Sequence, residues 1–524
     1  MHASSYNVLL SLFLLSNQGF AQLQLQWQNQ YNLLLDPYSI KYRVSNHGDI
    51  FIAGQQFQDT TGGVNVYKIN PSGDLEWHYQ FSGDSLLFPS LNDIYIDQDG
   101  KILLSGEVYR RFVVDIDVIL DQASSSFTIQ VDDNGTEDWI DIFTASDSSF
   151  VKGEKILKLD DTTYSVIILS ELPLVRNLMI FHYGKNGELR SRTTIETDST
   201  FSEIFQGIYS NEEEFLIPVL VRQEVGEYSV IRSYDFGGQF RDTFIVRPPH
   251  YFDLYSDLGK DQFYAALNLG LYGLSKLDQN GNHLWDYYIP KNLPENSFAD
   301  KVNTLISNTQ GIFVTGKHWG VSTGGDALTM KFDSDGDERW SYRYQNEDNA
   351  TYESGNDMIQ INNQVVVGGE QQMDSAGTSD FLLLVLSADS GELISKTVTD
   401  WGGDDKINKI IALDDHDFYV FGSSYTNDNE IVIQKYGLTT QQYDYQSVAF
   451  NLYPNPANET IYLESGDEIK TVSFYNLDGE LISKFENINS DKFTLGLAPL
   501  NSGMFFCNVQ LAKGFVRRKI AVIR

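Results

Sequence analysis

Short runs of alternating apolar and polar residues recur along most of the chain, and polar turns that contain glycine separate them. Gly311–Gly316, Ala327–Phe332 and Phe381–Leu386 are examples of such runs. A period of two places successive side chains on opposite faces and is typical of a half-buried β-strand. The pattern therefore predicts an all-β protein.

One larger unit repeats within this pattern: a strand, a turn with glycine, and a tryptophan four residues after the glycine. Four full copies occupy residues 70–77, 132–139, 278–285 and 333–340. Three weaker copies keep the glycine and lose the tryptophan: Gly187 with Ser191, Gly238 with Asp242, and Gly391 with Ser395. The anchor positions 77, 139, 191, 242, 285, 340 and 395 are separated by 62, 52, 51, 43, 55 and 55 residues. A unit of about 50 residues with four short strands has the size of a β-propeller blade.

The two ends of this region complement each other. Trp27, within residues 25–31, is an eighth copy of the tryptophan strand, and residues 406–436 supply three strands with no tryptophan strand after them. We expect the N-terminal strand to complete the last blade, which hides both free edges. The fold class predicted is an eight-bladed β-propeller, with seven blades as the alternative because the third to fifth copies are degenerate. The regular tryptophans are expected to pack between neighbouring blades: Trp27, Trp77, Trp139, Trp285 and Trp340.

The N-terminus has the features of an export signal. Residues 8–15 form an apolar run broken only by Ser11, and Ala21 precedes Gln22. The run is too short to span a bilayer and has the size of a signal-peptide core. We expect a signal peptide at residues 1–21, cleaved between Ala21 and Gln22, with a buried strand as the alternative. No later stretch reaches the length of about 18 apolar residues that a membrane span needs, so no transmembrane segment is expected.

The last part of the chain differs from the rest in charge. The whole chain has 72 acidic and 37 basic residues and a net charge of −35, whereas residues 459–524 contain eight of each kind. This shift indicates a boundary after the polar stretch 439–445. We expect the propeller at residues 22–440, a linker at 441–447 and a second domain at 448–524. Short strands separated by turns predict that this domain is a small Ig-like β-sandwich.

The tail resembles the C-terminal sorting domain of type IX (Por) secretion system substrates, a family typical of Bacteroidota. The matching segments are residues 452–457, 472–479, 497–506 and 518–523, with the motif residues Pro454, Asn455, Pro456, Gly479, Gly503 and Lys519. The resemblance implies transport through the periplasm and across the outer membrane by the type IX machinery. It also implies removal of the tail and a secreted or outer-surface location.

Residues 24–437 resemble the β-propeller repeats of secreted bacterial proteins, which combine Gly-x-Phe/Val-Val-Thr-Gly, an acidic loop, Asp-x-x-Gly and Trp. The similarity to eight-bladed quinoprotein dehydrogenases is poor, because their Thr-Gly before Trp and their vicinal cysteine pair are missing here.

Charge and cysteine content exclude several functions. A net charge of −35 argues against nucleic acid as a partner, because phosphate contacts need Lys and Arg. The single cysteine, Cys507, excludes a disulfide scaffold and a multi-cysteine metal site. We expect it to be a buried small apolar residue, with a reactive thiol as the alternative.

Local motifs supply no catalytic site. Gly320–Gly324 fits the G-x-S-x-G pattern, but it lies between two strands instead of before a helix. The acidic turns at 132–135 and 333–337 resemble fragments of calcium loops but lack the full ligand set, so turn formation explains them. The histidines are scattered and predict no metal site. No cofactor is expected, and calcium on an exposed acidic turn stays open.

Topology suggests where a ligand would bind. In a propeller, the loops between the second and third strands and the connectors between blades emerge on one face. Trp319 and Trp401, the two tryptophans outside the anchor position, both occupy such segments, and His318, Tyr352 and Tyr251 are expected on the same face. An aromatic side chain among carboxylates and glycines suits a sugar or a cation; local packing is the alternative interpretation.

Three functional hypotheses follow. The first is a binding or adhesion module whose ligand is a glycan or protein. The second is a glycan hydrolase or lyase with an axial carboxylate site, which predicts converging carboxylates with raised pKa values. The third is a structural surface protein. No catalytic residue can be chosen among 72 acidic side chains.

Overall fold

The structure is a computed structural model of the 524-residue chain. It describes residues 21–33, 35–58, 61–82, 87–115, 118–145, 150–171, 176–195, 202–205, 209–210, 214–223, 226–246, 252–256, 262–267, 273–278, 283–288, 301–320, 324–345, 352–372, 378–425, 429–440, 450–475, 481–485, 488–497, 502–511 and 514–523. Residues 1–20 of the expected signal peptide and the linker at 441–447 lie outside these residues. Among the residues described, no helix is long and apolar enough to cross a membrane.

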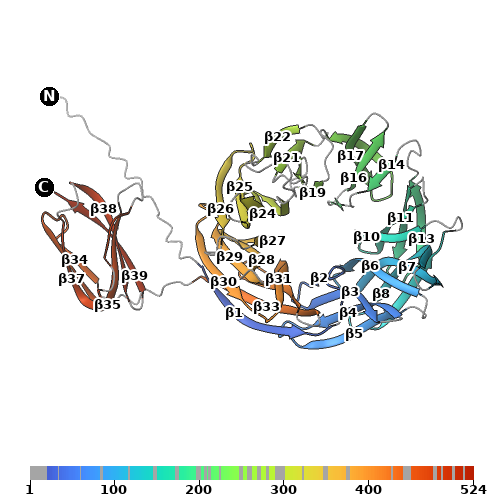
Figure 1. The fold of residues 1–524 in the computed structure, drawn as a ribbon, viewed down its shortest axis with the longest axis horizontal. Helices are drawn as coiled ribbons and strands as arrows, with labels where there is room; N and C mark the ends of the chain where they lie inside the picture. The colour runs from blue at the N-terminus through green and yellow to red at the C-terminus, as the bar shows by residue number, and fades with distance from the viewer. Residues whose placement is uncertain are drawn as a thin grey trace, which may run out of the picture. The chain divides into compact units, whose positions relative to one another are not determined.

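The chain divides into two compact units, residues 23–438 and the part from residue 439 onward. Within the first unit, the described strands form eight antiparallel sheets, each built on a path of four strands. Figure 1 shows these sheets following one another around a ring in chain order. This architecture of repeated four-stranded sheets is that of a β-propeller, as the spacing of the repeats predicts.

The first four sheets in chain order are β2–β5 (Lys41–Val44, Ile50–Gln58, Thr61–Ile69, Leu75–Ser82), β6–β9 (Leu87–Ile96, Ile102–Asp115, Val118–Val131, Glu137–Phe143), β10–β13 (Phe150–Asp160, Thr163–Glu171, Arg176–Gly184, Leu189–Ile195) and β14–β18 (Ser202–Phe205, Tyr209–Ser210, Glu214–Gln223, Gly226–Asp235, Phe240–Val246).

The next four are β19–β22 (Phe252–Ser256, Gln262–Leu267, Gly273–Asp278, His283–Tyr288), β23–β26 (Lys301–Asn308, Gly311–Gly320, Gly324–Phe332, Glu338–Tyr344), β27–β30 (Glu353–Ile361, Gln364–Gln372, Ser379–Ser387, Leu393–Thr399) and β31–β33 (Asp404–Ala412, Asp417–Tyr425, Asn429–Thr440) with β1 (Ala21–Tyr31).

The last sheet joins the two ends of the repeat region. Its strand order is β1-β33-β32-β31, so the N-terminal strand that carries Trp27 is hydrogen-bonded to β33. The closure expected from the unmatched tryptophan strand is therefore confirmed. Two segments separated by some 400 residues share one sheet, as the bond from Gln26 Nε2 to Asp417 Oδ1 (2.8 Å, 391 residues apart) also shows.

The five regular tryptophans all lie in the last strand of a sheet, and each ring contacts the glycine turn of the next sheet. A Cβ added to the turn glycine would meet the ring of the preceding sheet at 2.5–3.1 Å in five pairs: Gly73 with Trp27, Gly135 with Trp77, Gly187 with Trp139, Gly336 with Trp285, and Gly391 with Trp340. All five glycines have a positive φ. The turn therefore needs glycine twice, for its backbone conformation and for the space that the ring occupies.

Four of these rings also donate a hydrogen bond to the turn they contact. The bonds run from the indole Nε1 to a main-chain carbonyl: Trp27 to Pro71 (3.0 Å), Trp77 to Asp133 (2.8 Å), Trp285 to Ser334 (3.0 Å) and Trp340 to Ala388 (3.1 Å). Trp139 Nε1 is buried without a partner among the residues described. Where the preceding sheet lacks tryptophan, Ile180 and Ile195 fill the space beside Gly238.

Three of the tryptophans have a buried lysine beside them on the neighbouring strand. Lys68, Lys276 and Lys331 pair with Trp77, Trp285 and Trp340 in the strand register. Their Nζ atoms reach the same turn of the next sheet, at Asp133 Oδ1 (2.6 Å), Ser334 O (2.7 Å) and Ala388 O (2.8 Å) respectively. In each pair the lysine precedes the tryptophan by nine residues. Both side chains contact the turn of the next sheet, so each pair links two neighbouring sheets.

The second unit is a small β domain. Its six strands are β34 (Phe450–Tyr453), β35 (Thr460–Tyr475), β36 (Leu481–Phe485), β37 (Ser490–Gly496), β38 (Gly503–Leu511) and β39 (Gly514–Val522). The sequence predicted only short strands in this tail, whereas residues 460–475 form the single long strand β35. Its first half pairs with β34 and β37 and its second half with β36 and β38, with a register shift between Glu464 and Ile469.

Cys507 lies in the apolar core of this domain and is fully buried. Burial raises the pKa of its thiol to about 12. Its burial agrees with the buried apolar residue expected from the sequence.

Candidate functional site

The connector between β30 and β31 is a compact loop held by two carboxylates. Asp400 Oδ1 accepts a hydrogen bond from the Gly402 N–H, and Asp405 Oδ2 accepts one from the Trp401 N–H, both at 2.6 Å. The Trp401 ring is partly buried and packs against Phe381, with 6.4 Å between ring centroids. The side chains on either side of the ring are acidic, and Asp400 and Asp404 are exposed.

A third carboxylate joins this loop from the neighbouring sheet. Asp380, the second residue of β29, has one oxygen within 4.8 Å of an oxygen of Asp400 and of Asp405. Burial raises the pKa of Asp380 to about 6, and the charges of Asp400 and Asp405 act in the same direction. Burial also raises the pKa of Asp405. Within the described residues, these three side chains are a group of oxygen ligands able to hold a metal ion.

A second polar group lies next to this connector. Burial raises the pKa of Glu370 on β28, while the charges of Lys406 and Lys317 oppose that rise. Lys317 Nζ lies 4.5 Å from the ring centroid of Tyr352. Burial and the Glu370 carboxylate raise the pKa of Tyr352 to about 12. Glu370 therefore links the end of β24 and Tyr352 to the start of β31.

Two exposed tyrosines complete the surface. Tyr38, in the connector between β1 and β2, is 90% exposed, and Lys406 Nζ lies 5.8 Å from its ring centroid. Tyr425, the last residue of β32, is 58% exposed and lies opposite Asp404 in the strand register. We call residues 36–40, 400–406, Tyr352 and Tyr425 the connector face. It combines exposed aromatic rings with carboxylates.

The structure brings some of the sequence-predicted residues to this region. Tyr352 forms a bridge with Gly325, which pairs with Trp319 in the β24–β25 hairpin. His318 pairs with Asp326 in the same hairpin and is partly buried. The side chain of Trp319 and the whole of Tyr251 lie outside the described part of the structure.

Sequence reasoning missed Tyr38, Tyr425, Glu370 and Asp380. The first two occupy a blade connector and the end of a second strand, the same kinds of segment that pointed to Trp401, so the topological rule would have found them. Asp380 and Glu370 carry no such signal, because each is one of 72 acidic residues and becomes distinctive only through burial.

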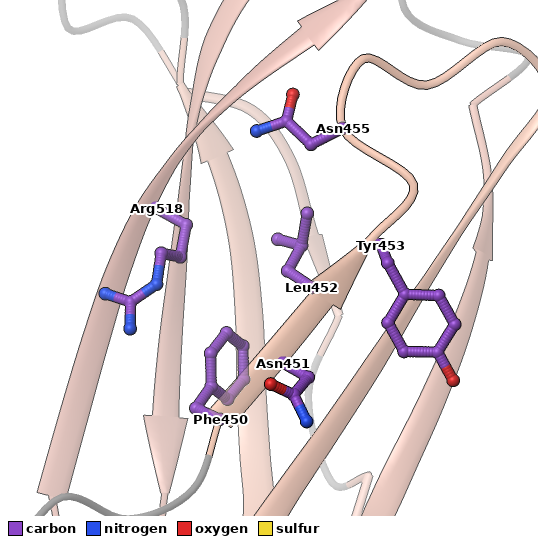
Figure 2. Close-up of a pocket in the computed structure, with 6 residues that line it drawn as sticks. All are labelled: Phe450, Asn451, Leu452, Tyr453, Asn455 and Arg518. Atoms are coloured by element: carbon purple, nitrogen blue, oxygen red, sulfur yellow. The ribbon is translucent and has the colours of Figure 1, made fainter.

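The second unit contains a cavity of about 340 Å³ lined by Phe450, Asn451, Leu452, Tyr453, Asn455 and Arg518. Figure 2 shows Arg518 from β39 on one side of Phe450 and Leu452, and Tyr453 on the other. Arg518 lies over the Phe450 ring, 5.7 Å from its centroid. Asn455 fixes the start of this unit to its end: its Nδ2 donates to Lys519 O (2.8 Å) and its Oδ1 accepts from Ala521 N (2.9 Å).

Several described motif residues of the tail therefore lie near one another. Pro454, Asn455 and Pro456 follow β34, and Lys519 lies in β39, whose main chain Asn455 binds. Gly503 begins β38, and Gly479 lies outside the described residues.

Comparisons with known proteins found solved structures similar to most of the chain and a family that matches the second unit. Solved structures with low similarity include the Dos1 propeller (13% identity, 77% of this chain and 96% of that chain, TM-score 0.44). They also include the polysaccharide lyase Uly1 (8% identity, 78% and 91%, TM-score 0.39). A third is a protein of unknown function from Dyadobacter fermentans (11% identity, 80% and 99%, TM-score 0.33). Similarities this low say nothing about function, and no curated protein matches the chain.

Residues 451–523 match the family described as the secretion system C-terminal sorting domain. The match covers the second unit from β34 to β39 and includes the residues through which the sequence resembled that family. The chain therefore combines a propeller-like β fold with a C-terminal Por secretion sorting domain, which directs it through the type IX system to secretion or the outer cell surface.

Proposed function

We propose that this protein is an exported binding module: an eight-bladed propeller, residues 22–440, that binds a glycan or protein through its connector face. A signal peptide at residues 1–21 starts its export, and an Ig-like sorting domain at 448–524, joined by the linker 441–447, completes it. The observation that carries the binding function is the pair of exposed tyrosines, Tyr38 and Tyr425, beside the acidic Trp401 connector.

The chemistry of the connector face favours a ligand rich in hydroxyl groups or positive charge. Tyrosine rings offer flat apolar surface with a polar end, a combination enriched at binding sites. Asp400 and Asp404 are exposed acceptors beside them. With a net charge of −35, the chain as a whole repels anionic partners at long range. We therefore expect a neutral or cationic ligand, such as an uncharged polysaccharide.

The converging carboxylates give the enzyme hypothesis its one supporting observation. Asp380, Asp400 and Asp405 converge and two of them have raised pKa values. However, Asp380 is 8% exposed and Asp405 is fully buried, so a polysaccharide would contact Asp400 alone. Glycoside hydrolysis also requires two carboxyl groups that flank the scissile bond, whereas only Asp400 of this group is exposed. This geometry favours binding over catalysis.

The sorting domain has its own proposed contact. The cavity beside Arg518 is built from the first and last segments of the family match, residues 450–455 and β39. We propose that this end of the domain contacts the type IX machinery, because the first and last motif segments, residues 452–457 and 518–523, meet there.

A screen of the chain from Gln22 onward against a panel of neutral, cationic and anionic polysaccharides tests the binding function, with product analysis on every ligand bound. We expect binding to a neutral or cationic member without turnover, and weaker binding in Tyr38→Ala. Release of shortened or unsaturated sugars would establish the enzyme hypothesis instead. No binding to any member would favour the structural alternative.

A further inference from the structure

The three carboxylates at the β30–β31 connector include buried oxygens that lack hydrogen-bond or ion-pair partners. Asp380 is 8% exposed, and its carboxylate has no hydrogen bond or ion pair with any residue that the structure describes. Buried carboxylates are normally paired, since moving an unpaired charge out of water costs about several kcal/mol. Asp380 therefore lacks the partner that its burial requires.

Asp405 shows the same deficit at one of its two oxygens. Its side chain is fully buried, and while Oδ2 accepts the Trp401 N–H, Oδ1 has no hydrogen-bond partner of good geometry. The Ser424 hydroxyl lies opposite Asp405 in the strand register and acts to lower the pKa of its carboxyl group, but it forms no hydrogen bond of good geometry with Oδ1. Two buried carboxylates of the group thus have free oxygens.

The three carboxylates converge on one another. One oxygen from each of Asp380, Asp400 and Asp405 lies within 4.8 Å of the other two. Asp400 and Asp405 each use one oxygen to bind a loop N–H, which fixes the direction of their carboxylates. The charges that act on Asp380 are those of Asp400 and Asp405, and both are negative. Three like charges at this spacing repel one another, and a bound cation would offset that repulsion.

The spacing and the ligand type select the ion. Calcium binds oxygen ligands at about 2.3–2.6 Å, so two of its ligands on opposite sides lie about 4.6–5.2 Å apart. Separations within 4.8 Å fit that coordination sphere. The group offers oxygen alone, without the nitrogen or sulfur that transition metals favour. Asp400 is exposed and opens the group to solvent.

We propose that Asp380, Asp400 and Asp405 form a calcium site that joins the sheet β27–β30 to the sheet that β31 begins. The ion contacts Asp380 from β29, Asp400 from the connector and Asp405 from β31. It compensates the buried charges and fixes the connector that carries Trp401. This site differs from the acidic turns at 132–135 and 333–337, where none of the aspartates is buried.

Calcium titration of the chain from Gln22 onward, first stripped with EDTA, tests the proposal by calorimetry and by thermal unfolding. We expect a dissociation constant of about 10⁻⁴–10⁻³ M, the range of extracellular calcium modules, and a higher unfolding midpoint with calcium. Asp380→Asn and Asp400→Asn should each weaken calcium binding at least about tenfold, because each removes one of three charged ligands. Asp335→Asn, in an exposed acidic turn, is the matched control and should bind as the parent does.

The unfolding temperature of Asp380→Asn without calcium distinguishes a metal ligand from an aspartate that only stabilises the fold. In EDTA, Asp380→Asn should unfold at the same or a higher temperature than the parent, because it removes a buried unpaired charge. With calcium, the parent should unfold at a higher temperature than this variant. Terbium provides a second readout: its luminescence, excited through tryptophan, should appear with the parent and fall with Asp400→Asn, in which the amide oxygen can still accept the Gly402 N–H.

Three results would overturn the proposal. The first is that the parent binds no calcium at 5 × 10⁻³ M, a concentration about five times the weakest dissociation constant expected. The second is an unchanged calcium response in both Asp380→Asn and Asp400→Asn. The third is loss of the calcium response in Asp335→Asn. None of them depends on whether the connector face binds a glycan, so the site and the proposed function can fail separately.

Discussion

Replacing Gly336 by alanine tests the contact between a tryptophan ring and the glycine turn of the next sheet. Gly336 has φ +87°, and its added Cβ would lie 2.6 Å from the Trp285 ring. Gly402 provides a matched control: its φ is +90°, and nothing lies within 4 Å of its added Cβ. Both substitutions strain the backbone equally, but only one of them crowds a ring.

The expected costs follow from these two terms. A positive φ costs an alanine about 1–2 kcal/mol, so Gly402→Ala should lower the free energy of unfolding by that amount. Gly336→Ala adds an overpacking cost of about 1–3 kcal/mol, which gives about 2–5 kcal/mol in total. The difference between the two variants, about 1–3 kcal/mol, is the contribution of the ring contact.

Urea unfolding followed by tryptophan fluorescence measures this difference directly. All seven tryptophans lie before residue 402, so the signal reports the propeller unit and not the sorting domain. EDTA keeps any ion from the connector that contains Gly402. In the Trp285→Ala background, Gly336→Ala should cost only the backbone term, because the ring is gone. Equal destabilisation by Gly336→Ala and Gly402→Ala, or no rescue by Trp285→Ala, would refute the contact.

Three further predictions concern other parts of the chain. Trp340→Phe should cost about 1–3 kcal/mol more than Trp139→Phe in urea unfolding, since Trp340 Nε1 bonds the Ala388 carbonyl and Trp139 Nε1 is buried without a partner; equal costs would contradict this. Cys507 should resist alkylation at pH 8 and react after unfolding, because it is buried and its pKa is raised to about 12; labelling of the folded chain would show an open core. Arg518→Ala should reduce the exported fraction in cell fractionation, whereas the exposed Lys492→Ala should not, and equal export would remove the cavity from the secretion contact.

Much of the architecture could be predicted from the sequence because it depends on local patterns. The period of two gives strands, and the glycine turn with a tryptophan four residues later gives the repeat. All seven internal anchor positions lie in the last strand of a sheet, even where Ser191, Asp242 and Ser395 replace the tryptophan. The charge balance marked the tail as a separate unit, and the unmatched Trp27 strand indicated the closure through β1.

The functional side chains were harder to predict because their distinctive properties arise only on folding. Asp380 and Asp405 belong to segments separated along the chain and become a group only when β29 and β31 lie side by side. The lysines at nine residues before Trp77, Trp285 and Trp340 did repeat in sequence, but a lysine in a strand normally faces solvent. Their burial, at 5–9% exposure, follows from the turn of the next sheet.

The affinity of the connector face for its strongest polysaccharide ligand tests the central claim most directly. The double variant Tyr38→Ala/Tyr425→Ala should raise the dissociation constant at least about 30-fold, because we expect both tyrosines to be hot spots, where truncation costs roughly 1 kcal/mol or more each. Tyr462→Ala, a 44% exposed tyrosine of the sorting domain, is the control and should bind as the parent does. Unchanged affinity in the double variant, or an equal loss in Tyr462→Ala, would contradict a ligand site on this face.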